Sequence, residues 1–178
     1  VRTSADPLRN ALHGLTATST AKDMEGFEIS HLFDFKERGD IWHTDYYTKA
    51  VPFEFTVDLH GVNTLDKLWY VPRSNAGNGT ITSADISVSR DGKAWTDVGE
   101  QTWQRDARTK VVMFRDHPVA RYVRVTVKAG IGGFGSGSEL YVFKVPGTKT
   151  VLPGDINDDG KVDENDLTSY LNYNGLKK

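Results

Sequence analysis

The sequence predicts an all-β protein, an antiparallel β-sandwich of the jelly-roll type, followed by a short C-terminal segment with a loop and a helix. Three observations carry this prediction. Short runs of alternating apolar and polar residues fill the region 15–145, turn residues separate these runs, and helical spacing is almost absent there. About eight strands in roughly 130 residues are closed most economically by two packed sheets.

The clearest strand is expected at residues 53–59, where four apolar side chains alternate with Glu54, Thr56 and Asp58 and share one face. An Asp-Gly pair at 91–92 is typical of a tight hairpin. Further strands are expected at 65–71, 84–89, 110–114, 121–127 and 139–145. Strand-like motifs also contain Trp42, Trp69 and Trp95, which are therefore expected in the core.

Composition excludes several classes of function. The 178 residues suit one domain of ordinary size plus a tail. With 22 basic and 24 acidic residues, the formal charge of −2 favours neither a nucleic-acid partner nor a polybasic membrane patch. The absence of cysteine removes disulfides and thiol catalysis without deciding the compartment. No apolar run approaches a membrane span, and we expect a monomeric piece of a longer protein.

The most specific motif is residues 155–166, whose oxygen-bearing side chains have the spacing that a calcium ion requires. Glycine at loop position six allows the sharp turn, the residue at position seven offers its backbone carbonyl, and aspartate at position twelve replaces the usual glutamate. The predicted calcium ligands are Asp155, Asn157, Asp159, Lys161, Asp163 and Asp166.

A helix is expected directly after this loop, because Leu167, Tyr170 and Leu171 share one face at helical spacing. Two Pro-Gly pairs favour a linker at 146–154. A calcium loop with only an exiting helix resembles the first repeat of a type I dockerin, which implies a cohesin-like or an intramolecular partner. A solvated acidic tail is the alternative. Because one loop and helix bury little apolar surface, we expect residues 155–178 to be mobile or incompletely folded, with calcium occupancy left open.

Seven further motifs occur in a recognisable order before the linker. They are Phe33-Asp34, Ile-Trp-His-Thr at 41–44, the strand 53–59, Tyr-Val-Pro-Arg at 70–73, residues 86–95, Ala-Arg-Tyr-Val-Arg-Val at 120–125 and residues 138–143. This series resembles the discoidin-like (coagulation factor V/VIII type C) domains, and most of all carbohydrate-binding module family 32. The resemblance covers residues 1–145 and implies a galactose-binding-domain-like sandwich. It also implies a noncatalytic module of a secreted, periplasmic or cell-surface bacterial glycoside hydrolase, such as a hexosaminidase or chitobiase-like enzyme.

The resemblance implies a shallow sugar site formed by His43, Arg73, Asn78 and Phe134. Arg73 would grip two adjacent ring hydroxyls with its rigid fork of donors. His43 and Asn78 can donate to or accept from other hydroxyls. Phe134 lies among glycines and would stack on the apolar face of the ring, and Tyr46 would extend this surface. Such a set suits an axial hydroxyl, so galactose, N-acetylgalactosamine or a related hexosamine glycan is the expected ligand.

Each of these residues also has a structural explanation. Arg73 could hold its own loop, His43 could be a packing histidine, and Phe134 could anchor its loop to the core. Tyr46 and Tyr47 could pack back on the sheet. The alternative function is therefore a structural spacer or protein-interaction domain between a catalytic domain and a dockerin-like anchor. Lipid binding is disfavoured, because the loops lack apolar spikes framed by basic residues.

The resemblance further implies a structural calcium ion between the segment around Asp34 and Glu139, with Asp40 as a third candidate ligand. Hard calcium accepts any of these oxygens. The chain departs from the family pattern here, since Phe35 stands where glycine is frequent. Simple hydrogen bonds that fix the loop are the alternative.

Overall fold

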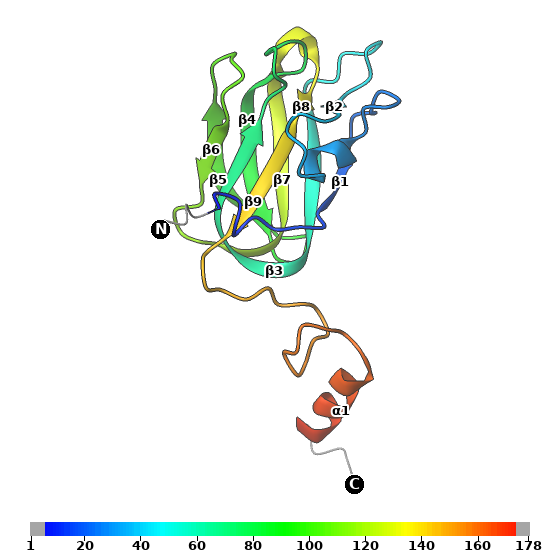
Figure 1. Cartoon of the computed structure of the whole chain (residues 1–178), viewed down its shortest axis with the longest axis vertical. Coiled ribbons are helices and arrows are strands. Elements are labelled where there is room, and N and C mark those ends of the chain that lie inside the picture. Colours follow the sequence, from blue (N-terminus) through cyan, green and yellow to red (C-terminus); the bar gives the residue numbers. More distant parts are fainter. Residues whose placement is uncertain (1–5, 174–178) are drawn as a thin grey trace.

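The computed structural model describes residues 6–173 and shows two packed β-layers with a tail below them (Figure 1). All strand pairs are antiparallel, which confirms the predicted all-β antiparallel sandwich. The strands of the two layers are β1 (Thr16–Ser19), β3 (Phe53–Val71), β4 (Ile81–Ser89), β5 (Thr96–Thr102), β6 (Lys110–Met113), β7 (Val119–Gly130) and β9 (Glu139–Lys144).

One long strand, β3, connects the two layers. Its first half joins the order β1-β3-β7-β4-β5, and its second half pairs with β6 and β9. The sequence predicted two separate strands at 53–59 and 65–71. They are instead continuous across a register shift between Asp58 and Asn63, where His60 has a φ of 58°. This bulge bends the strand without ending it.

The core lies between the layers and is made of the inward half of each alternating strand. Trp42 is fully buried there, as predicted, whereas the other two tryptophans lie outside this core and are only partly buried. Trp69 alternates with the inward-facing Leu68 and Tyr70, so it points to the outer face and packs against Phe143 at 4.7 Å. Trp95 is half-buried in the turn before β5, and the guanidinium group of Arg124 lies over its ring.

A small ladder at the upper end of the sandwich positions the loops. It consists of β2 (Trp42–His43) and β8 (Ser136–Gly137), which pair antiparallel outside the two layers. Short 3-10 turns flank it at η1 (Ile29–Phe33) and η2 (Ile131–Gly133). The ladder brings the loop after residue 43 beside the Gly-rich segment 130–137.

Residues 146–154, expected as a linker, make ordered contacts with the lower end of the sandwich. Val151 and Val62 exchange two backbone hydrogen bonds of 2.8 Å. The Thr150 hydroxyl also donates to Oδ1 of the buried Asn63 at 2.6 Å. The expected helix follows the loop as α1 (Glu164–Tyr173), and residues 174–178 of the predicted tail lie outside the described residues. The mobility of the tail 155–178 in solution stays a prediction.

No helix within residues 6–173 is both long and apolar enough to cross a lipid bilayer.

Candidate functional site

His43 forms the floor of a loop cluster at the upper end of the sandwich. It ends β2, pairs with Ser136 and is only 1% exposed. Its Nδ1 lies 2.6 Å from the carbonyl oxygen of Thr44, which accepts a hydrogen bond from the ring. The Tyr46 ring stands perpendicular to the imidazole at 4.6 Å, and the Phe134 ring is tilted to it at 5.6 Å. Two aromatic side chains therefore flank the histidine.

The loop between β3 and β4 adds Arg73 and Asn78 to this cluster. Nη1 of Arg73 donates to the backbone carbonyl of Asn78 at 3.0 Å, and the Ser136 hydroxyl donates to the same oxygen at 3.0 Å. The following residue, Gly79, has a φ of 84°, and a Cβ there would lie 2.6 Å from the side chain of Ser136. Only glycine allows this close approach of the loop to β8.

The Gly-rich segment places Phe134 next to Asn78. Gly132 has a φ of 73°, and a Cβ at this position would lie 3.0 Å from Oδ1 of Asn78 and 3.1 Å from the Phe134 ring. The amide and the aromatic ring therefore both lie beside the same glycine. Together with the contacts of His43, this brings all five predicted residues into one cluster: His43, Tyr46, Arg73, Asn78 and Phe134.

The cluster is a shallow surface with a buried imidazole at its base. Tyr46 is 43% exposed, Asn78 is exposed, and Arg73 and Phe134 are half-buried. Burial lowers the pKa of His43 from 6.5, and the nearby Arg73 guanidinium acts in the same direction against the carbonyls of Thr44 and Asn78. The ring is therefore neutral at pH 7, so it can donate through one nitrogen and accept through the other.

Sequence reasoning missed a residue that holds this cluster in place. Nε of Arg105, in the loop after β5, donates to the carbonyl of Ala76 at 2.8 Å, and Ala76 has a φ of 47°. Arg105 thus fixes the middle of the loop that carries Arg73 and Asn78. No local pattern signals this contact, because its two partners are 29 residues apart.

A second polar group lies under the loop after η1. Oε1 of Glu139 and Oδ1 of Asp34 both accept a hydrogen bond from the backbone N–H of Lys36, at 3.0 and 2.8 Å. Glu139 is 0% exposed, and its Oε2 is buried with no hydrogen-bond partner among residues 6–173. Burial and the adjacent Asp34 raise the pKa of Glu139 to about 9. Two carboxyl groups this close favour a proton or a cation between them.

The prediction that Asp40 joins Asp34 and Glu139 is wrong. A turn closed by the hydrogen bond from Gly39 N to Lys36 O carries Asp40 to an exposed position. The missed acidic neighbour is Glu37, which accepts a hydrogen bond of 3.0 Å from the hydroxyl of Tyr141. In the part of the chain that the structure describes, no three His, Cys, Asp or Glu side chains gather as a metal-binding group.

The structure shows how phenylalanine is tolerated at position 35, where glycine is frequent in the family. Its φ of 59° is in the left-handed region that glycine favours. The ring stacks on His13 at 3.9 Å and meets Tyr141 edge-on at 5.3 Å. These contacts hold the backbone in the conformation that the adjacent Asp34 and Lys36 require.

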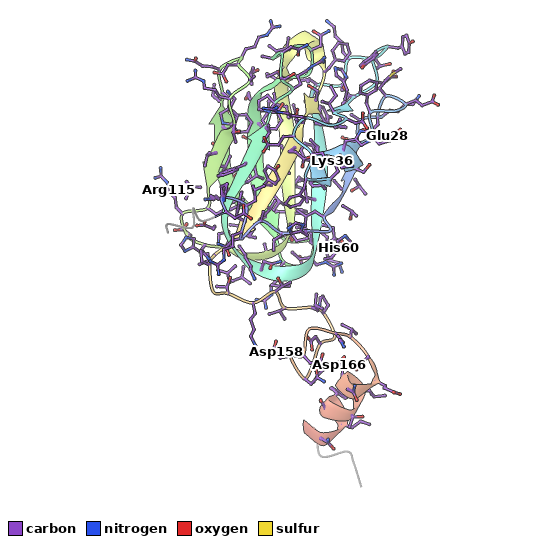
Figure 2. All side chains as sticks on the ribbon, viewed as in Figure 1. Glu28, Lys36, His60, Arg115, Asp158 and Asp166 are labelled. Atoms are coloured by element: carbon purple, nitrogen blue, oxygen red, sulfur yellow. The ribbon has the colours of Figure 1, made fainter. Side chains whose placement is uncertain are left out.

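The C-terminal loop 155–166 is closed by its own carboxylates. Asp166, 4% exposed, accepts hydrogen bonds from the N–H groups of Ile156 at 2.8 Å and Asp163 at 2.6 Å. Asp155 accepts from the N–H groups of Asp159 and Gly160, at 3.1 and 2.9 Å. The first and last positions of the predicted calcium loop are therefore held by backbone donors; Asp166 is labelled in Figure 2. Calcium binding by this loop stays a prediction, as do the roles of Asn157 and Lys161.

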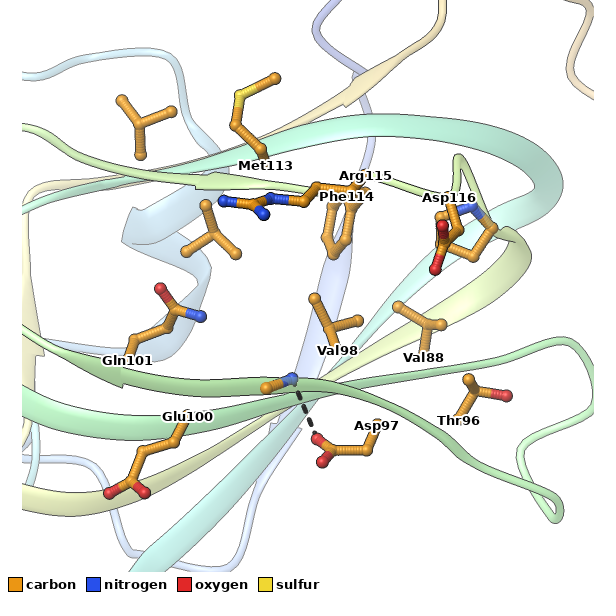
Figure 3. Close-up of a pocket in the computed structure, with 14 residues that line it drawn as sticks. Val88, Thr96, Asp97, Val98, Glu100, Gln101, Met113, Phe114, Arg115 and Asp116 are labelled. Atoms are coloured by element: carbon orange, nitrogen blue, oxygen red, sulfur yellow. Dashed lines mark hydrogen bonds between the residues drawn. The ribbon is translucent and has the colours of Figure 1, made fainter.

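A cavity of about 500 Å³ lies apart from these groups, between the edge strands β5 and β6 (Figure 3). Its floor contains Val88, Val98 and Phe114, and its rim contains Asp97 and Arg115. None of the five clustered loop residues lines it. Phe114 is 1% exposed and offers no aromatic surface. We therefore place the candidate site in the loop cluster.

Comparison with known proteins agrees with this geometry. Residues 14–140 match the family model of the F5/8 type C domain. The chain belongs to the F5/8 type C family. It is 34% identical to CpGH89CBM32-5 from Clostridium perfringens, in complex with GalNAc-β-1,3-galactose, with a TM-score of 0.69 over 75% of this chain and 99% of that one. It is 28% identical to the family 32 carbohydrate-binding module of Clostridium perfringens NanJ, in complex with galactose, with a TM-score of 0.70 over 76% and 98%.

Both of these solved relatives of the F5/8 type C sandwich hold a bound sugar. A curated relative is the A type blood N-acetyl-α-D-galactosamine deacetylase of Flavonifractor plautii, which is 34% identical over 131 residues. The match covers 72% of this chain but only 17% of that enzyme. The chain therefore corresponds to a small part of its enzymatic relative.

Proposed function

We propose that the sandwich binds galactose, N-acetylgalactosamine or a related hexosamine glycan at the loop cluster. The observation that carries this proposal is the convergence of Arg73, Asn78 and Phe134, from two separate loops, on His43 at the end of β2. A spacer without a ligand gives no reason for an arginine, an asparagine and an aromatic ring to meet above a buried histidine. Two similar modules, 34% and 28% identical, were solved with galactose-containing ligands, which supports the same sugar class here.

The proposed roles follow from what each side chain has free. A guanidinium carries five N–H donors, and Asn78 O accepts from Nη1 of Arg73, so other donors remain for two adjacent hydroxyls. The Phe134 and Tyr46 rings offer apolar faces for the C–H face of the sugar. The His43 ring can bind one further hydroxyl. Because a shallow site buries little area, we expect millimolar to micromolar affinity, about −4 to −8 kcal/mol.

Calcium is proposed at Asp34 and Glu139, where the buried and unpartnered Oε2 of Glu139 supports a cation. A hard ion there would neutralise the two adjacent carboxylates and replace the proton that otherwise separates them. Its role is structural, because it would tie the loop after η1 to β9.

A second calcium is proposed in the loop 155–166, as part of a dockerin-like element with a cohesin-like or intramolecular partner. Its ligand spacing supports this proposal. We further propose that the complete protein is a bacterial glycoside hydrolase that acts outside the cytoplasm. The module would bind the glycan and so raise the concentration of substrate near the catalytic domain.

Calorimetric titration of the full chain with galactose, N-acetylgalactosamine and glucose tests the proposed function. We expect the first two sugars to bind and glucose, with its equatorial O4 hydroxyl, to bind at least about tenfold more weakly. Phe134→Ala should weaken galactose binding about two- to tenfold, through loss of stacking. The control is Met113→Ala, an exposed apolar side chain on β6. If no galactoside, hexosamine or other glycan binds, the spacer is the better explanation.

A further inference from the structure

A cavity of about 320 Å³ lies behind the loop that carries Tyr46. Residues 20–22 form one wall, and residues 45–53 form the other. The lining side chains that matter here are those of Thr20, Lys22, Asp45, Thr48, Lys49 and Phe53. The hydrogen bond from Asp45 N to Lys22 O, at 2.8 Å, holds the two walls together.

The cavity has an excess of positive charge. Lys22 and Lys49 are both exposed, and neither ammonium group has a hydrogen bond or an ion pair within residues 6–173. The single carboxylate on the lining is Asp45, whose Oδ1 accepts a hydrogen bond from the N–H of Tyr47 at 3.2 Å. Two free cations form a surface that attracts an anion, whereas the Thr20 hydroxyl is already bonded to the backbone of Glu54.

This cavity shares its wall with the proposed sugar site. The Lys49 stem lies against Gly133, where a Cβ would approach Cδ of the lysine to 3.1 Å. Ala50 N and Val51 N both donate to the carbonyl of Gly133, at 2.8 and 3.1 Å. Gly133 immediately precedes Phe134. Gly133 therefore contacts the cavity through Lys49 and carries the aromatic ring of the sugar site on the next residue.

We propose that this cavity is a second subsite, which binds an anionic group on a saccharide whose galactose-type unit occupies the loop cluster. The anion is a carboxylate or a sulfate ester, and Lys22 and Lys49 bind it as point charges. This inference rests on the proposed function and specifies its ligand further, as an acidic glycan. A neutral galactoside gains nothing from the two lysines.

Paired calorimetric titrations of the full chain test the subsite. The probes are lactose, lactose sialylated on galactose O3 or O6, and lactose sulfated at the same positions. We expect one or more acidic probes to bind about three- to tenfold more tightly than lactose, because each exposed charge pair contributes about two- to threefold. This advantage should shrink at high salt, which screens exposed charges.

Variants of the two lysines separate the subsite from the sugar site. K22A/K49A should abolish the acidic advantage and leave the lactose affinity unchanged, whereas K22R/K49R should retain the advantage. The matched control is Lys93→Ala, an exposed lysine in the turn between β4 and β5. The subsite alone is overturned if K22A/K49A still binds an acidic probe more tightly than lactose. It is also overturned if the unmodified chain binds lactose but binds no acidic probe more tightly. Failure of the unmodified chain to bind lactose or any acidic probe overturns the proposed function as well. The sialylated and sulfated probes distinguish a carboxylate from a sulfate.

Discussion

The guanidinium of Arg73 donates to the carbonyl oxygen of Asn78 at 3.0 Å, so the arginine both closes its loop and faces the candidate site. The structural and the binding explanations of Arg73 are therefore not exclusive. The contact fixes the orientation of the fork, and the donors that Asn78 does not use are held ready for a ligand.

Arg73→Lys separates these two tasks. A lysine retains the charge but has no planar fork, so galactose binding should weaken about tenfold through the loss of one or two hydrogen bonds of about 1 kcal/mol each. Calorimetry measures this change, and Arg115→Lys, an exposed arginine near the lower end of the sandwich, is the control (Figure 2). Unchanged galactose affinity in the lysine variant would mean that Arg73 only holds its loop.

The lowered pKa of His43 predicts how stability depends on pH. Burial disfavours the protonated ring, so the unfolded chain, with a histidine pKa near 6.5, binds a proton before the folded chain does. The stability contribution is fully present above about pH 6.5 and is lost as the pH falls through the lower folded value. Relative to a His43→Gln variant, the melting temperature of the unmodified chain should therefore fall as the pH drops below 6.5, whereas the raised pKa of Glu139 acts in the opposite direction in both chains.

Replacing His43 by glutamine should remove part of this acid sensitivity. His60→Gln serves as the control, because His60 is exposed near the lower end of the sandwich (Figure 2). An equal slope of melting temperature against pH in the unmodified chain and in His43→Gln would show that the histidine is not held neutral by burial.

Removal of calcium should destabilise the sandwich through Glu139. Without a cation, this buried carboxyl keeps a proton, as its pKa of about 9 indicates. Addition of calcium after chelation should raise the melting temperature by several degrees at pH 7, since a bound ion stabilises the folded state by mass action.

Glu139→Gln should abolish this rise, and Asp40→Asn should leave it intact because Asp40 points to solvent. A response to calcium that is the same in both variants would assign the effect to the loop 155–166 instead.

Hydrogen exchange distinguishes the docked linker from the tail. The amides of Val62 and Val151 should be protected, since each donates to the other residue's carbonyl at 2.8 Å. Amides of 155–173 should exchange quickly without calcium, because the loop and α1 bury little apolar surface; Val162 and Leu167 are 59% and 60% exposed. Thr150→Val should reduce protection at Val151 by removing the hydrogen bond to Asn63. Strong protection throughout 155–173 without calcium would contradict a mobile tail.

Local alternation predicted the strands well, but it did not predict where they end or which way every side chain points. The sequence predicted separate strands on the two sides of His60-Gly61, yet β3 passes through this pair as a bulge because both halves find partners. Trp69 is large and apolar, but its place between two inward residues sends it outward. Size alone does not decide burial in a strand.

The sequence predicted those residues of the candidate site whose family motif lies in a loop that the fold carries to the cluster. His43, Arg73, Asn78 and Phe134 lie in loops that the ladder of β2 and β8 brings together. Asp40 was misplaced because a turn of four residues redirects the chain. The cavity with Lys22 and Lys49 joins segments that contact each other only in the folded structure, so no sequence pattern signals it.

Amide chemical shifts during a galactose titration test most directly whether galactose binds at the loop cluster. We predict that the shifts concentrate at the amides of Thr44, Asn78 and Gly79 and at residues 132–135, which surround His43. Shifts confined to the cavity between β5 and β6, at Asp97, Gly99 and Arg115, or no shifts at all, would contradict galactose binding at the loop cluster.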